Sequence, residues 1–141
     1  MSHPIIIEQK VNAPAEKVWK AITDKNEMKI WYFDIPDFIL EIGKVFNFYE
    51  PGDERKYRHQ AEILEIIHGN KFKHTWYYPD FSDKKTTVIW ELVPEGDRTL
   101  IRLTHDDIDH FEDLGEKFSR EAFKEGWDGI IGQSLKSYVE A

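Results

Sequence analysis

The sequence predicts an α+β fold in which a curved antiparallel sheet wraps around one long C-terminal helix. The first observation is an apolar stripe over residues 115–139, where large side chains recur at spacings of three and four. The second is a middle region of short runs that alternate with a period of two and are joined by tight turns. A helix with such a stripe needs an apolar partner surface, and the strand-like runs supply it.

Two short helices are expected after the first strand. Residues 4–11 are rich in isoleucine and predict a strand. Asn12 or Ala13 is then suited to cap a helix that carries Pro14 in its first turn. A second, shorter helix is expected over residues 27–32.

The strands that follow are short and closely linked. We expect them at residues 37–40, 44–49, 55–67, 71–78, 86–93 and 99–105. Turn sequences at residues 50–53 and 94–97 separate neighbouring runs. Such short connections imply an antiparallel meander.

The C-terminal helix contains glycine at every third position of one segment, namely Gly126, Gly129 and Gly132. Each glycine in a helix costs about 1 kcal/mol relative to alanine. Three of them indicate either close backbone approach or volume left vacant beside the helix. The spacing is not that of a dinucleotide-binding fingerprint, which follows a strand.

Composition narrows the possible functions. A chain of 141 residues fits a single domain spanning residues 1–141. The net charge of −8 argues against a nucleic-acid partner. The absence of cysteine excludes disulfides, thiol catalysis and zinc–thiolate sites. No signal peptide or membrane-spanning run is visible, so we expect a cytoplasmic protein without membrane insertion. We also expect no cofactor.

Several segments, in their order and spacing, match a known family pattern, and they are residues 14–19, Trp31, residues 61–66, 75–76, 90–92, 104–105 and 126–127, Leu135 and Tyr138. In these segments the chain resembles the SRPBCC superfamily, with its START-like helix-grip fold, and within it bacterial proteins related to the C-terminal domain of the activator of the ninety-kilodalton heat-shock-protein ATPase. The resemblance implies a sheet of about seven strands gripping the last helix around a hydrophobic cavity. It also implies that many members bind lipids, polyketides or other apolar molecules. Phe123 replaces a histidine that the family often has there.

The inward positions predict a ligand-binding site, with solid core packing as the alternative interpretation. The candidate ligand-binding residues are Trp31, Phe46, Phe48, His59, Trp76, Tyr78, Trp90, His105, Phe123 and Trp127. His59, His74 and His105 share inward parity and could orient a ligand, although three separately hydrogen-bonded histidines would fit the pattern better.

The sequence offers no catalytic or metal-binding residues that we can name. The acidic run at residues 105–113 lacks the glycine of a calcium loop, and no nucleophile-elbow motif occurs. The main hypothesis is therefore a module that binds a small apolar or amphipathic molecule. One alternative is a co-chaperone with a heat-shock-protein partner, which needs a surface patch near Arg58, Lys73 and Arg102. The other is a cyclase-type enzyme that uses the same cavity.

Overall fold

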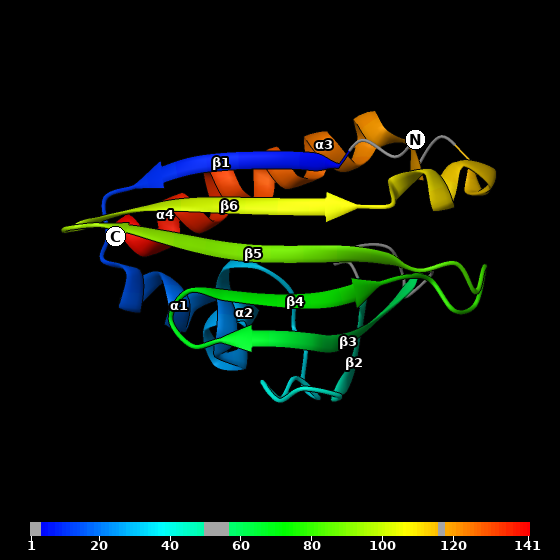
Figure 1. Cartoon of the computed structure of the whole chain (residues 1–141), viewed down its shortest axis with the longest axis horizontal. Helices are drawn as coiled ribbons and strands as arrows, with labels where there is room; N and C mark the ends of the chain where they lie inside the picture. Colours follow the sequence, from blue (N-terminus) through cyan, green and yellow to red (C-terminus); the bar gives the residue numbers. More distant parts are fainter. Residues whose placement is uncertain (1–3, 50–56, 116–117) are drawn as a thin grey trace.

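The computed structural model describes residues 4–49, 57–115 and 118–141, which form one six-stranded antiparallel sheet with the helices on one face (Figure 1). The strands are β1 (Ile5–Val11), β2 (Val45–Tyr49), β3 (Arg58–Ile67), β4 (Lys71–Trp76), β5 (Thr86–Glu95) and β6 (Arg98–Asp106). Their spatial order is β1-β6-β5-β4-β3-β2, so the first strand pairs with the last and the rest form a meander.

The helices pack behind the sheet as Figure 1 is drawn. They are α1 (Ala15–Thr23), α2 (Lys25–Trp31), the 3₁₀ helix η1 (Ile108–Leu114), α3 (Arg120–Gly129), the π-helical η3 (Ile130–Leu135) and α4 (Lys136–Glu140). The last three are continuous and run behind β1 and β6. No helix among the described residues combines the length and the apolar character needed to cross a bilayer.

The period of two predicted the buried face of the sheet correctly. Phe72, His74 and Trp76 of β4 are buried, and their neighbours in the strand are partly exposed. The strands β5 and β6 pair from Thr87 to Glu95 of β5 and are joined by a two-residue turn, where Gly96 takes a positive φ of 69°. A register shift between Ile63 and Glu65 interrupts the β3–β4 pairing, and such bulges bend a strand and strengthen its twist.

The C-terminal helix begins at Arg120, five residues later than the predicted start at residue 115. Gly115 has a φ of 106°, which is incompatible with a right-handed helix. The side chain of Ser119 then accepts a hydrogen bond from the backbone N–H of Ala122 and caps the first turn.

The π-helical segment keeps one line of side chains facing the sheet. Trp127, Ile131, Leu135 and Val139 are all buried at intervals of four residues. An α-helix turns about 40° too far over each such interval, so three intervals would rotate the stripe away by about 120°. The wider π turn compensates for this drift. The hydroxyl of Ser134 also donates to the carbonyl of Trp31, which ties the helix to α2.

Three local predictions were wrong. Residues 37–40 are not a strand, because the chain turns at Asp37 and has no regular structure over residues 38–40. The carboxylate of Asp37 accepts from the backbone N–H of Asn47 at 3.2 Å. The sheet therefore has six strands in the described residues rather than about seven. The second helix starts at Lys25 because Asp24 caps it, and Pro14 rather than Asn12 or Ala13 is the N-cap of α1. The predicted turn at residues 50–53 lies outside the described residues.

Candidate ligand-binding site

A cavity of about 270 Å³ lies between α3 and the sheet. Its lining residues are Phe33, Tyr57, Trp76, Tyr78, Phe118, Ala122, Phe123, Gly126, Trp127 and Ile130. Seven of these ten residues are aromatic, so the lining is suited to a ligand with an apolar surface rather than to a strongly charged ligand. The volume is close to the lower limit for small-molecule sites, which indicates a small ligand.

One wall of the cavity is a face of α3. Ala122 and Gly126 follow each other at an interval of four residues, and Phe123 and Trp127 form a second, parallel row. A Cβ atom built onto Gly126 meets no heavy atom within 4 Å, so this glycine borders open space. Gly126 is exposed and Phe123 is half-buried, which places the mouth of the cavity on this side.

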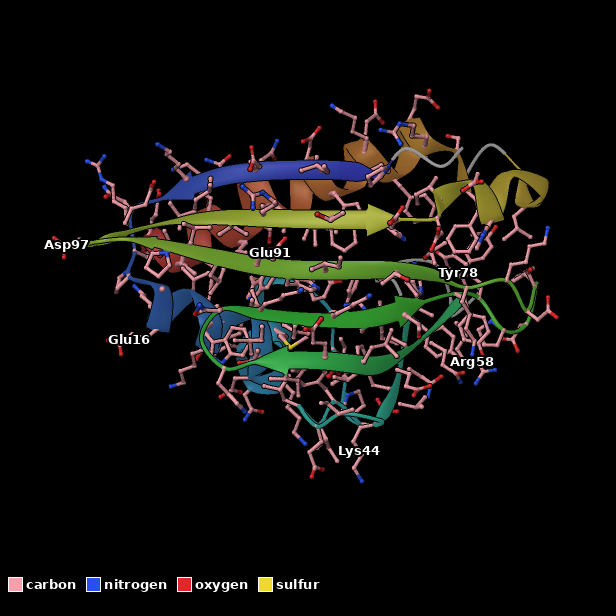
Figure 2. The ribbon with its side chains drawn as sticks, in the orientation of Figure 1. Glu16, Lys44, Arg58, Tyr78, Glu91 and Asp97 are labelled. Atoms are coloured by element: carbon pink, nitrogen blue, oxygen red, sulfur yellow. The ribbon has the colours of Figure 1, made fainter. Side chains whose placement is uncertain are left out.

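The opposite wall and the floor come from the sheet. Trp76 and Tyr78 are buried together with Trp127, and the Nε1–H of Trp76 donates to the Tyr78 hydroxyl oxygen at 3.1 Å. Figure 2 shows Tyr78 near the end of the β4 arrow, at the same end of the sheet as Arg58. The indole N–H of Trp76 is therefore already hydrogen-bonded within the protein.

His105 lies directly behind the floor. The Nε1–H of Trp127 donates to Nδ1 of His105 at 3.0 Å. An indole can only donate, so Nδ1 must accept and the imidazole proton resides on Nε2. That Nε2 lies 2.8 Å from Oγ1 of Thr86, whose hydroxyl donates to the carbonyl of Trp76 at 2.6 Å.

A second buried pair has the same chemistry. The Nε1–H of Trp90 donates to Nε2 of His74 at 3.0 Å, and Nδ1 of His74 then donates to the carbonyl of Thr75 at 2.8 Å. Burial lowers the pKa of His74 to about 4, against a smaller raising effect of the Thr75 carbonyl. Burial, and next the proximity of His74, lowers the pKa of His105 to about 3. Both imidazoles are therefore neutral near pH 7.

The structure divides the ten predicted site residues into three groups. Four line the cavity, namely Trp76, Tyr78, Phe123 and Trp127. His105 lies one hydrogen bond behind it. The other five are buried elsewhere and pack among the aromatic side chains of the core, and they are Trp31, Phe46, Phe48, His59 and Trp90.

The packed group has well-defined partners. Trp31 donates from Nε1 to the carbonyl of Ala21 at 2.8 Å. The ring of Phe48 stacks on His59 with centroids 4.7 Å apart, and Trp90 stacks on Phe72 at 5.8 Å. His59, His74 and His105 are all buried, and each makes hydrogen bonds within the protein.

Sequence reasoning missed six of the lining residues. Ala122, Gly126 and Ile130 could have been found, because they extend the helix face that carries Phe123 and Trp127. Phe33, Tyr57 and Phe118 lie outside the named strands and helices. Neither the helical period of 3.6 nor the strand period of two therefore predicts the direction of their side chains.

The acidic run after β6 is a structured connection. Asp107 has a φ of 64° and precedes η1, and the carboxylate of Asp106 accepts from its backbone N–H at 2.8 Å. His110 contacts the carbonyl of Lys85 through Nδ1 at 2.6 Å. Across the described residues, no three His, Asp or Glu side chains are grouped closely enough to share a metal ion.

The sequence and fold of this chain were compared with those of known proteins. A family model described as Activator of Hsp90 ATPase homolog 1-like protein matches residues 12–140. The search of curated protein sequences returns no similar relative.

Solved structures with the same fold come from several bacteria. CalU16 from Micromonospora echinospora is 25% identical, with a TM-score of 0.72 over 98% of this chain and 76% of that one. Protein CV1439 from Chromobacterium violaceum is 16% identical, with a TM-score of 0.79 over 98% of both chains. The Aha1 dimer from Colwellia psychrerythraea is 18% identical, with a TM-score of 0.71 over 98% of this chain and 96% of that one.

Proposed function

The chain belongs to the family of Activator of Hsp90 ATPase homolog 1-like proteins, and from that premise we propose that it binds a small apolar or amphipathic molecule in the cavity between α3 and the sheet. The observation that carries this proposal is the cavity itself, with its predominantly aromatic lining and its mouth beside Gly126. Burial of apolar ligand surface would drive binding at about 25 cal/mol per Å², before the costs of association.

The hydrogen bonds of the floor favour binding over catalysis. The N–H groups of Trp76 and Trp127 are directed at protein acceptors, and both ring nitrogens of His105 lie within hydrogen-bonding distance of protein partners. A general acid or base must instead reach the reacting atoms of a substrate. These groups shape the cavity, so we propose a carrier or sensor of its ligand rather than a cyclase.

The co-chaperone alternative has less support from the surface. Arg58 pairs with Asp80 and Arg102 pairs with Glu8, with N–O distances of 3.2 and 2.7 Å. Two of the three cations of the predicted patch are thus neutralised by neighbouring carboxylates. We therefore give priority to a test of ligand binding.

Gly126→Leu is expected to lower the affinity for a cavity ligand at least tenfold. The new side chain enters the space beside the glycine, while leucine favours the helix by roughly 0.8 kcal/mol relative to glycine. Titration of 2-naphthol, followed by amide chemical shifts and calorimetry, measures the change. The variant should bind weakly and yet melt at the same temperature as the wild type or above it.

Gly129→Leu is the matched control. Gly129 lies in the same helix, a Cβ atom built onto it also meets no heavy atom within 4 Å, and it does not line the cavity. Its variant should gain the same helix propensity and bind 2-naphthol with unchanged affinity. A wild-type protein whose amide shifts stay fixed across a broad panel of lipids and aromatic compounds would contradict the proposal.

A further inference from the structure

Two tryptophans that line the cavity, Trp127 and Trp76, are connected through the protein by hydrogen bonds that run from the Trp127 indole to the Trp76 backbone carbonyl. Trp127 of α3 donates to His105 of β6, His105 contacts Thr86 of β5, and Thr86 donates to the carbonyl of Trp76 at the end of β4. The strands β6, β5 and β4 are neighbours in the sheet, so this chain of hydrogen bonds runs across them and into the helix. We call it the floor relay.

Each member of the floor relay has a fixed hydrogen-bonding direction. Because the indole donates, His105 must accept at Nδ1 and donate from Nε2, and the Thr86 hydroxyl then donates a hydrogen bond to the Trp76 carbonyl. The relay is fully buried at His105 and Thr86. Water cannot substitute easily for a missing member there, so the loss of one bond leaves a buried polar atom unpaired.

The first and last residues of the floor relay, Trp127 and Trp76, both line the cavity. Trp127 belongs to the helix wall and Trp76 to the sheet wall. We propose that His105 is a positioning residue for this cavity, which holds the Trp127 indole at a fixed place relative to the sheet and thereby sets the size of the ligand that is admitted. This inference depends on the proposed ligand-binding function.

Packing around the imidazole supports a positioning role. Phe123, another lining residue, meets the His105 ring edge-on with centroids 5.2 Å apart and an interplanar angle of 80°. Trp76 lies 5.7 Å away and Trp127 lies 5.9 Å away by the same measure. His105 thus contacts three cavity residues from behind, without itself lining the cavity.

The chain supplies its own control in the Trp90–His74 pair. The indole-to-imidazole distance is 3.0 Å in both pairs, and both histidines are buried. Trp90, however, does not line the cavity. Loss of either hydrogen bond should therefore destabilise the fold in a similar way, and only loss of the His105 bond should alter ligand selection.

The test compares the affinities of two uncharged probes that differ only in size, 2-naphthol and 2-hydroxyanthracene. In His105→Leu the ratio of the two dissociation constants should shift about tenfold in favour of the larger probe, which corresponds to one lost hydrogen bond. In His74→Leu the ratio should stay within about twofold of the wild-type value. His105→Asn, which returns an acceptor near the position of Nδ1, should restore part of the wild-type ratio.

A second variant covers the case in which His105→Leu does not fold. Trp127→Phe keeps an aromatic ring but lacks the N–H, so it should shift the ratio in the same direction, and His105→Leu should add little in that background. An unchanged ratio in a folded Trp127→Phe or His105→Leu protein that still binds would overturn the role of His105 and leave the binding function intact. Failure of the wild type to bind either probe would overturn both.

Discussion

Acidification from pH 7.5 to 4.5 is expected to lower the free energy of unfolding by about 5 kcal/mol through His74 and His105 alone. Their pKa values in the folded protein are about 4 and about 3, against 6.5 for an ordinary histidine. Between these limits the unfolded chain binds protons that the folded protein excludes, so stability falls as the pH falls below 6.5. Each histidine contributes about 1.4 kcal/mol per pH unit within its window.

Urea denaturation at several pH values measures this slope. His74→Leu is the informative variant, because it retains every carboxylate and removes one of the two histidines whose pKa is lowered by burial. It should be less stable at pH 7.5, since the Trp90 N–H loses its acceptor, and its slope between pH 6.5 and 4.5 should be smaller by about 1.4 kcal/mol per pH unit. A slope equal to that of the wild type would show that His74 is not held neutral by burial.

Trp127→Ala is expected to cost about 4 kcal/mol or more of unfolding free energy. The side chain is 2% exposed and meets Trp76 and Trp90 edge-on with ring centroids 5.3 and 5.7 Å apart. Truncation of a buried tryptophan costs about 3–5 kcal/mol. It also leaves Nδ1 of His105 without its donor, which adds to the loss.

Indole should partly rescue this variant. The truncation opens an apolar space with an acceptor at its inner end, and indole can both fill that space and donate to Nδ1 of His105. At a concentration ten times its dissociation constant it would restore about 1.4 kcal/mol. Benzene, which cannot donate, should rescue less, and Trp127→Phe should respond little to either compound. Equal rescue by the two compounds would contradict the role of the hydrogen bond.

The sheet could be predicted from sequence because burial on one face imposes a strict alternation. Val88, Trp90 and Leu92 of β5 and Ile101 and Leu103 of β6 are buried as that alternation requires. Features fixed by single contacts could not be predicted in this way. The Asp37 side chain bonds the Asn47 backbone ten residues away, and the backbone at Gly115 breaks a pattern that otherwise continues into the helix.

The lining of the cavity was predicted only in part, for a related reason. The alternation of apolar and polar residues along a strand predicts which side chains point inward. It does not predict at which end of the sheet those side chains lie. Trp76 and Trp90 share this parity, yet Trp76 lines the cavity and Trp90 stacks on Phe72. Depth along the sheet follows from where the helix and the irregular segments pack, which no single strand encodes.

The π-helical segment also indicates where the chain could lose a residue. Gln133 is exposed within η3. Its deletion would leave the positions of Trp127 and Ile131 unchanged and would shorten the spacing between Ile131 and Leu135 from four residues to three. The resulting mixture of three- and four-residue intervals is the ordinary stripe of an α-helix. A shortened relative could thus present the same inward side chains with a conventional backbone, and lengths that differ by one residue here need not signify a different interior.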